Sequence, residues 1–280
     1  MIAACLKWVD RRPQVDPLDA HVSIDSRTAG MSAADAAALE WALRSGQAWG
    51  QPVLAVTAGP AAADDVLREA LAAGAARAIR VDVDISAPSE VVAGVLAAEL
   101  LAAGVTTVWC GDHSLDRGSG SVPAYLAAEL GVAQALGLVA VELGNAHDTT
   151  ALRRLDGGRR ERLRVAGSGV LSVEGATARL RRAPLPAAMA ARTAPIDVRA
   201  GPVSSPAPDA VLRPFRPRPR VLSAPSGDAL ERIAALTDTG ATKGHSEVVV
   251  LDAAAAAARI LEALGTWGYL TPASEPAAPA

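Results

Sequence analysis

The segment from Val108 to Gly131, VWCGDHSLDRGSGSVPAYLAAELG, contains the best candidate for a ligand-binding loop. It begins as an apolar run, turns at Gly111, crosses a glycine- and serine-rich loop and continues into an alanine-rich stretch. A strand, a Gly/Ser loop and a helix start in this order are typical of phosphate-binding loops, because free backbone N–H groups and the helix dipole attract an anion.

We expect the helix after this loop to begin at Ser119 as its N-cap, so that the N–H groups near Gly118 to Ser121 point outward. The hydroxyls of Ser119 and Ser121 can add hydrogen bonds, and Pro123 fits a first helical turn. The alternative is a capped turn without a ligand, because Gly/Ser loops are common. The chain has neither a GxGxxG fingerprint nor a GxxxxGK[ST] loop, so neither a standard dinucleotide fold nor a P-loop is indicated.

Two further loops follow or face the same expected sheet edge. TAGP at 57–60 again places a glycine after an apolar run, and AGMSAADAAALEWAL at 29–43 opens a helix at Ser32. Because parallel α/β sheets bind ligands at the carboxyl ends of their strands, the three loops could converge on one ligand.

Other residue types that support chemistry give weaker indications. Cys5 and Cys110 are the only cysteines, form no CxxC pair, and at strand ends are more typical of buried packing residues than of nucleophiles. The four histidines show no metal-ligand spacing. His113, beside Asp112 and Asp116, could act in acid–base chemistry, although a solvated loop histidine is the favoured interpretation.

The elements that would position these loops alternate along the first half of the chain. Glycines at 74, 104 and 131 stand where helices commonly end. Strand–helix alternation predicts a parallel sheet. Buried strands are expected at 2–6, 52–58, 78–83 and 106–110, and helices at 32–46, 61–74, 88–103 and 120–130.

The pattern changes after residue 137. Three strand-like segments follow without a helix between them, and the DGG at 156–158 predicts a hairpin turn. Residues 201–220 are rich in proline and arginine, one more helix is expected over 252–270, and the last ten residues are rich in Pro, Ala and Ser. We therefore expect an α/β domain over 1–200, a Pro-rich linker over 201–226, a C-terminal arm with a helix over 227–270 that packs on a partner, and a disordered tail over 271–280.

Composition excludes several classes of protein. The formal net charge of the 280 residues is −3, which gives no general attraction to nucleic acid or anionic lipid. No apolar run approaches the length of a membrane span, and the N-terminus lacks the features of a signal peptide. We expect a cytoplasmic protein that binds no nucleic acid and inserts into no membrane.

Several segments, in order, resemble the beta subunit of electron transfer flavoproteins. ACLKWVD resembles that family's first strand, and GMSAADAAALEWAL falls where the family has Met-Asn-Pro and a helix. LAVTAGPAAADDVLREALAAGAARAIRV is the most similar segment, CGDHSLDRGSGSVPAYLAAELG stands at the family's nucleotide-binding segment, and LPAAMAARTAPIDV matches its Leu-Pro-x-Ile-Met segment. The resemblance covers roughly residues 1–200.

The resemblance implies a Rossmann-like parallel sheet flanked by helices, similar to adenine nucleotide alpha hydrolases, with a β-hairpin region and an extended C-terminal arm. It implies a heterodimer with an alpha subunit that holds most of the FAD site, while this chain binds AMP or a second FAD. The complex would carry electrons from a dehydrogenase to a quinone reductase or another acceptor, as a carrier and not as an enzyme. The implied nucleotide contacts are Cys5, Ser32, Ala33, Ala34, Asp35, Ala58, Gly111, Asp112, His113, Ser114, Asp116, Gly118, Ser119, Gly120, Ser121 and Val122.

The sequence departs from the family's pattern in places that affect these implications. The loop keeps Asp116 but has Gly118 in place of an acid and Ser121 in place of a glutamine, and Arg11 replaces an aromatic residue. ARLRR at 178–182 replaces the family's partner-docking loop, which implies a dehydrogenase other than the common acyl-CoA type. The implied docking residues are Arg179, Arg181, Arg182, Leu185, Pro186 and Met189.

Three alternatives remain open from the residues. Leu185 could belong to the core, with the neighbouring arginines forming a solvated face. The chain could be a stand-alone adenine-nucleotide-binding protein of the universal-stress type, although such domains end near their sheet. It could also be an ATP-pyrophosphatase-type enzyme, although the N-terminus lacks the Ser-Gly-Gly-x-Asp-Ser loop of that class.

Overall fold

The structure is a computed structural model that describes residues 1–16, 21–23, 25–145, 147–202, 227–236, 249–266 and 269. The chain divides into two compact units, Met1–Phe215 and Arg216–Ala280. The described part of the second unit contains α6 (Ala229–Leu236) and α7 (Ala253–Thr266), so the helix expected over 252–270 is confirmed as the shorter α7. Residues 203–226 of the expected linker and the tail 271–280 lie outside the described residues.

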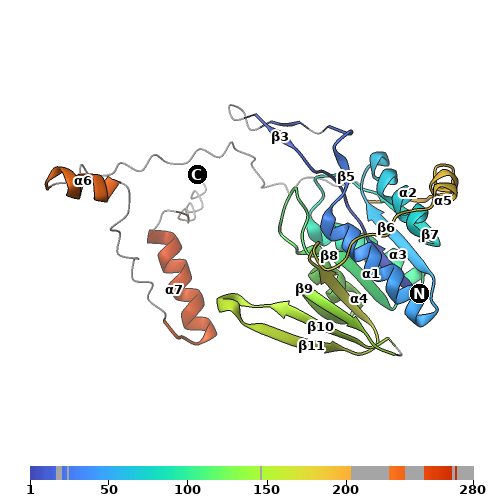
Figure 1. Ribbon diagram of the computed structural model, residues 1–280. Coiled ribbons are helices and arrows are strands. Elements are labelled where there is room, and N and C mark those ends of the chain that lie inside the picture. Colours follow the sequence, from blue (N-terminus) through green and yellow to red (C-terminus); the bar gives the residue numbers. More distant parts are fainter. Residues whose placement is uncertain are drawn as a thin grey trace, which may run out of the picture. The chain divides into compact units, whose positions relative to one another are not determined.

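A nine-stranded sheet forms the centre of the first unit (Figure 1). Neighbouring strands from β9 to β13 run parallel, whereas β10 and β11 are antiparallel additions at one edge. This arrangement confirms the predicted α/β class. The strand order is β11 (Arg160–Val165), β10 (Thr149–Arg154), β9 (Ala133–Leu143), β12 (Gly169–Val173), β8 (Thr107–Gly111), β1 (Ile2–Cys5), β6 (Val53–Ala58), β7 (Arg77–Asp82) and β13 (Asp197–Ala200).

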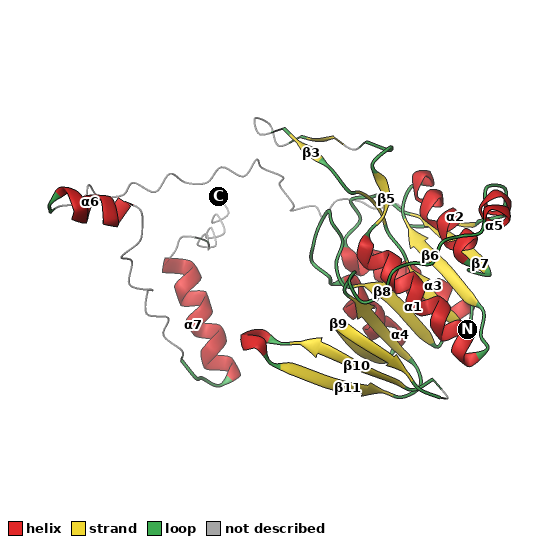
Figure 2. Cartoon of the chain, viewed as in Figure 1, coloured by secondary structure: helices red, strands yellow, loops and turns green. Residues whose placement is uncertain are grey.

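Helices pack on both faces of this sheet (Figure 2). The helices are α1 (Ala33–Trp49), α2 (Asp64–Ala73), α3 (Ser89–Ala102), α4 (Val122–Leu130) and α5 (Leu185–Ala191), with short 3₁₀ turns η1 (Ala61–Ala63) and η2 (Asp156–Gly158). Two small antiparallel ribbons pair β2 (Trp8–Asp10) with β5 (Ala29–Met31) and β3 (Gln14–Val15) with β4 (Val22–Ser23).

Burial of the sheet on both faces explains the short apolar runs of the sequence. In β1, Ile2 and Ala4 belong to the core formed with α1 and α2, whereas Ala3 and Cys5 belong to the core formed with α3 and α4. All four residues of β1 are buried. Because successive side chains point to opposite faces of a strand, a strand covered on both faces must be apolar throughout.

The hairpin predicted at DGG is confirmed, because β10 and β11 pair as antiparallel neighbours around η2. Gly157 and Gly158 have φ angles of +70° and +75°, which a tight turn between strands requires. After this hairpin the chain returns as β12, which inserts between β8 and β9 and runs parallel to both.

The helix start predicted at Ser119 is wrong. Helix α4 begins at Val122, with Ser121 at the preceding position and a proline in the first turn. Gly118 and Gly120 have φ angles of +67° and +60°, and left-handed residues cannot continue a right-handed helix. The loop after β8 is therefore longer than the sequence pattern indicated. The N-cap predicted at Ser32 is confirmed, because its hydroxyl accepts the Asp35 N–H at 3.0 Å.

Candidate functional site

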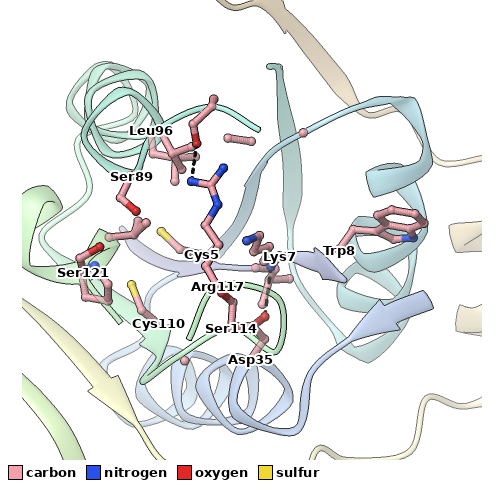
Figure 3. A pocket seen from close by; sticks show the side chains of 18 of the residues that line it. Cys5, Lys7, Trp8, Asp35, Ser89, Leu96, Cys110, Ser114, Arg117 and Ser121 are labelled. Atoms are coloured by element: carbon pink, nitrogen blue, oxygen red, sulfur yellow. Dashed lines mark hydrogen bonds between the residues drawn. The ribbon is translucent and has the colours of Figure 1, made fainter. Parts of the chain in front are cut away.

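A cavity opens at the carboxyl ends of β1, β6 and β8, in the first unit (Figure 3). The chain passes from β1 to β6 on one side and later returns to β8 on the other side, so the cavity lies at the point where the strand order reverses. Open α/β sheets bind ligands at this position. The empty space is about 950 Å³ with its open mouth included.

The floor and one wall of this cavity are apolar. Cys5 ends β1 and Cys110 lies near the end of β8, and both face the core layer formed with α3 and α4. Val92 and Leu96 of α3 and Ala58 of β6 also belong to the apolar lining. Such a surface is suited to a flat, weakly polar group such as a nucleobase.

The loop between β8 and α4 forms the polar side of the cavity. Ser119, Gly120 and Ser121 line it, and within the described part of the chain their three N–H groups have no hydrogen-bond acceptor. The hydroxyl oxygens of Ser119 and Ser121 lie 3.0 Å apart. The first turns of α3 and α4 also border the cavity, through Ser89 and Val122. Unpaired N–H groups beside helix N-termini favour an anionic ligand.

Gly120 is required by this loop for reasons of both conformation and space. Its φ angle is +60°, and a Cβ atom there would lie 2.5 Å from the carbonyl oxygen of Asp112. Only glycine combines that conformation with that approach of the backbone.

Two side chains tie the loop to neighbouring elements. Lys7, which follows β1, donates from Nζ to Asp116 at 2.5 Å. Arg117 extends across the cavity in Figure 3 and donates to the carbonyl oxygens of Ala87 and Ile85 at 2.7 and 3.3 Å. Burial alone would raise the pKa of Asp116, but hydrogen bonds from Lys7 and Ser114 outweigh it and lower that pKa.

Asp35 joins the ends of β1 and β8 beneath the loop. Its carboxylate accepts the Lys7 N–H at 3.2 Å and a backbone hydrogen bond from Gly111. A Cβ at Gly111 would lie 2.6 Å from the Asp35 carboxylate, so a larger residue there would displace the Asp35 side chain. Burial raises the pKa of Asp35 to about 7, against the opposing effect of hydrogen bonds from Lys7, Ser32 and Gly111.

The raised pKa of Asp35 predicts that the free energy of unfolding falls as the pH rises from the ordinary pKa of 3.8 to about 7. Folded Asp35 holds its proton up to about pH 7, whereas in the unfolded chain it loses the proton near its ordinary pKa of 3.8. The free energy of unfolding should therefore fall by about 2 kcal/mol between pH 5 and pH 7 on account of this one group. Urea titrations of the wild type and Asp35→Asn at both pH values would measure the difference.

In Asp35→Asn this part of the pH dependence should disappear, because the amide does not titrate. Asp84→Asn is the matched control, since Asp84 lines the same cavity but its pKa is lowered by hydrogen bonds from Ser86. Its pH dependence between pH 5 and 7 should equal that of the wild type. Equal slopes in all three proteins would contradict the assignment of a protonated, buried Asp35.

Ten of the sixteen residues expected to contact a nucleotide line this cavity. They are Cys5, Asp35, Ala58, Gly111, His113, Ser114, Ser119, Gly120, Ser121 and Val122. Four of the others lie beside it or behind it. Gly118 donates its N–H to Ser114, Asp116 pairs with Lys7, the Asp112 carboxylate lies 2.9 Å from His113 Nδ1, and Ala34 packs against Gly111.

The remaining two, Ser32 and Ala33, line a different groove, with Arg11, Glu69 and Arg182. The cavity contains residues that sequence reasoning missed, above all Lys7, Arg117 and Ser89. Lys7 could have been found from its position directly after the first strand. Nothing in the sequence pattern indicated that the loop after β7 would supply the carbonyl groups that hold Arg117.

The six residues expected to dock a redox partner do not form one uniform surface. Leu185 and Met189 of α5 are 73% and 63% exposed, so neither belongs to the core of the described structure. Pro186, Arg179 and Arg182 are exposed as well. The end of α5 is held by buried Ala191, whose carbonyl oxygen accepts a hydrogen bond from Arg68 at 3.0 Å.

Arg181 has a different environment from its two neighbours. Its guanidinium pairs with Glu40 of α1, with contacts of 2.9 and 3.1 Å, and its backbone N–H also donates to Glu40 at 3.1 Å. Glu40 is 4% exposed and accepts a further bond from Arg44 at 2.8 Å. Burial alone would raise the pKa of Glu40, but these hydrogen bonds outweigh it and lower that pKa.

Other kinds of site find no support among the residues that the structure describes. No group of three or more His, Cys, Asp or Glu side chains there could hold a metal ion. Over the same residues, every helix is too short or too polar to traverse a lipid bilayer.

The fold and the site define an α/β protein with a cavity, bordered by unpaired N–H groups of the described loop, at the switch point of a parallel sheet. A sequence model of the electron transfer flavoprotein domain matches residues 21–203. The chain therefore belongs to the electron transfer flavoprotein domain family, whose members carry electrons and bind FAD and AMP. A comparison with curated proteins gave no match.

Proposed function

We propose that this chain is the beta-type subunit of an electron transfer flavoprotein, and that it forms a heterodimer with an alpha-type subunit. The family match supports a role in electron transfer and a partner subunit of the same family. The assignment to the beta type rests on the ordered resemblance of residues 1–200 and on the position of the loop between β8 and α4.

We further propose that the cavity binds an adenine nucleotide, either AMP or a second FAD. One observation carries this proposal: the N–H groups of Ser119, Gly120 and Ser121, unpaired within the described residues, border a cavity whose floor and one wall are apolar. The N–H groups would hold a phosphate, and the surface formed by Cys5, Val92 and Leu96 would receive the base. The alternatives of a universal-stress-type protein and an ATP-pyrophosphatase gain no support from the family match.

The residues of this chain would bind and orient the cofactor and would perform no reaction themselves. A flavin held mainly by the alpha-type subunit supplies the electron transfer when bound. Lys7 and Arg117 hold the loop over the cavity, and Asp35 fixes the ends of β1 and β8 beneath it. The carrier would take electrons from a dehydrogenase and pass them to a quinone reductase or another acceptor in the cytoplasm.

Co-expression of the chain with an alpha-type subunit tests this function. The two chains should purify together as a yellow complex, and denaturing extraction should release FAD together with AMP, or two FAD molecules per heterodimer. The arm over 227–270 is expected to pack on the partner, so a chain that ends at residue 202 should bind the alpha-type subunit more weakly. A colourless preparation in which the chains do not associate would contradict the proposal.

We propose that α5 docks the electron-donating dehydrogenase. Leu185 is 73% exposed at the first position of α5, and a leucine that becomes fully buried in a pocket of the partner would contribute at least about 1 kcal/mol to binding. Leu185→Ala should leave the heterodimer and its flavin intact but slow reduction by the native dehydrogenase about fivefold or more. Stopped-flow reduction of the flavin measures this rate.

Flanking arginines would speed the encounter with an acidic patch and make the rate depend on salt. Arg182→Ala should therefore weaken the salt dependence of reduction, because Arg182 is exposed. Leu101→Ala is a matched control, since Leu101 is 60% exposed on α3, away from α5. A Leu185→Ala variant that loses stability and keeps the wild-type rate would contradict the docking role.

A further inference from the structure

Cys5 and Cys110 form a pair at the floor of the cavity. They are direct register partners on the neighbouring parallel strands β1 and β8, and both side chains face the same core layer. Adjacent strands lie about 4.8 Å apart, which is within the Cα–Cα range of about 4.4–6.8 Å that a disulfide requires. The two thiols are close enough for Cys5 to raise the pKa of the Cys110 thiol.

The pair is buried but lies at the edge of an open cavity. Cys5 and Cys110 are 7% and 4% exposed, and both line the cavity beside Ser121 (Figure 3). These two residues are also the only cysteines of the chain, so every thiol of this protein belongs to the pair.

We propose that Cys5 and Cys110 are a dithiol site that small-molecule disulfides, such as oxidised glutathione, convert to an intramolecular disulfide. The reaction takes place at the floor of the cavity and therefore in the space where the proposed nucleotide would lie. The dithiol chemistry does not depend on the proposed function. Only the expectation that a nucleotide protects the pair rests on it.

The reaction balances in two exchange steps. The Cys5 thiolate attacks one sulfur of the oxidant, forms a mixed disulfide and releases one small thiolate. The Cys110 thiolate then attacks the Cys5 sulfur, forms the Cys5–Cys110 bond and displaces the second small thiolate. Overall, two protein thiols lose two protons and two electrons, and the oxidant becomes two small thiols.

The order of the steps follows from the environment of Cys110. The hydrogen bond with Cys5, burial and the neighbouring Asp35 charge raise the pKa of Cys110 well above its ordinary value. A thiol that seldom ionises is a poor first nucleophile for a reagent in solution. It can still complete the second step, because the mixed disulfide places the Cys5 sulfur beside it at a high effective concentration.

Intact-protein mass spectrometry tests the site directly. The folded full-length chain is incubated with oxidised glutathione, free thiols are then alkylated, and the mass is measured. The wild type should lose two hydrogens and carry neither glutathione nor an alkyl group. Cys110→Ser should instead accumulate a stable glutathione adduct on Cys5, because the second step has no nucleophile. Cys5→Ser should likewise form no internal disulfide, because Cys110 is its only remaining thiol.

Two outcomes would overturn the proposal. The first is a wild type that accumulates the glutathione adduct, which would show that Cys110 cannot reach Cys5. The second is a folded wild type with two unreacted thiols that both become alkylated after unfolding.

Added AMP provides a separate readout, since a bound nucleotide should slow the oxidation. Oxidation at an unchanged rate with AMP would count against the proposed nucleotide site and leave the dithiol site intact.

Discussion

Gly120→Ala should weaken nucleotide binding about 100-fold or more, enough to remove the nucleotide during purification. The new Cβ would lie 2.5 Å from the Asp112 carbonyl oxygen, which is backbone and cannot rotate away. The loop must therefore shift, and the N–H groups of residues 119–121 would lose their alignment on the phosphate. Hydrogen bonds to a charged group contribute about 1.5–3 kcal/mol each, so the loss of two gives the expected effect.

Gly131→Ala is the matched control for this prediction. Gly131 has a φ angle of +64°, close to the +60° of Gly120, but a Cβ there meets nothing within 4 Å. Both variants therefore introduce the same backbone strain, and only one disturbs the cavity. Denaturing extraction and calorimetry with AMP should show nucleotide loss in Gly120→Ala alone. Equal nucleotide content in both variants would exclude the loop as the phosphate site.

Arg181→Ala should lower the free energy of unfolding by about 3 kcal/mol, the lower end of the range for a broken buried ion pair. Glu40 is 4% exposed, and removal of Arg181 leaves its carboxylate buried with Arg44 as its remaining cationic partner. Arg181 connects the segment before α5 to helix α1, so the loss should also loosen that segment. Urea denaturation at pH 7 measures the change.

Arg182→Ala is the control for this second prediction, because the neighbouring Arg182 is exposed. Its stability should stay within about 0.5 kcal/mol of the wild type. The lowered pKa of Glu40 adds a test by pH. A carboxyl group whose pKa is lowered by folding stabilises the protein above its ordinary pKa of 4.5, and this contribution is lost as the pH falls below that value. The difference in free energy of unfolding between wild type and Arg181→Ala should therefore decrease below pH 4.5. A difference that stays constant there would contradict the ion-pair explanation.

The difference between Arg181 and its neighbours could not be predicted from the docking segment itself. In the sequence, Arg179, Arg181 and Arg182 are equivalent members of one basic cluster. Their environments differ only because helix α1 places Glu40, which is 141 residues away along the chain, beside Arg181. Long-range pairing of this kind leaves no local pattern, because it depends on how two distant elements pack.

The loop after β8 was predicted in part. Its composition of glycine and serine after an apolar run was sufficient to identify a candidate phosphate-binding loop. The N-cap of α4 was predicted at Ser119, whereas the structure has Ser121 at that position and Val122 as the first helical residue. Residue types alone do not reveal the left-handed conformation of Gly118 and Gly120, which keeps both residues within the loop.

The contacts that shape this loop lie within it, whereas the contacts that anchor it are tertiary. Gly120 lies close to the Asp112 backbone, and Gly118 donates to the Ser114 carbonyl oxygen, so both contacts form only when the loop closes. Lys7 and Arg117, which anchor the loop, became visible only when β1 and the segment after β7 were placed beside it.

Local residue patterns were enough to predict the α/β class, the parallel strands β1, β6, β7 and β8, and the helices between them. They were enough because strands covered on both faces are apolar throughout and helices end at glycine. The insertion of β12 between β8 and β9, the path of Arg117 across the cavity and the register pairing of Cys5 with Cys110 emerged only from the packed fold. Each of these depends on which strands become neighbours, and strand order is set by the packing of the whole sheet, which no local pattern encodes.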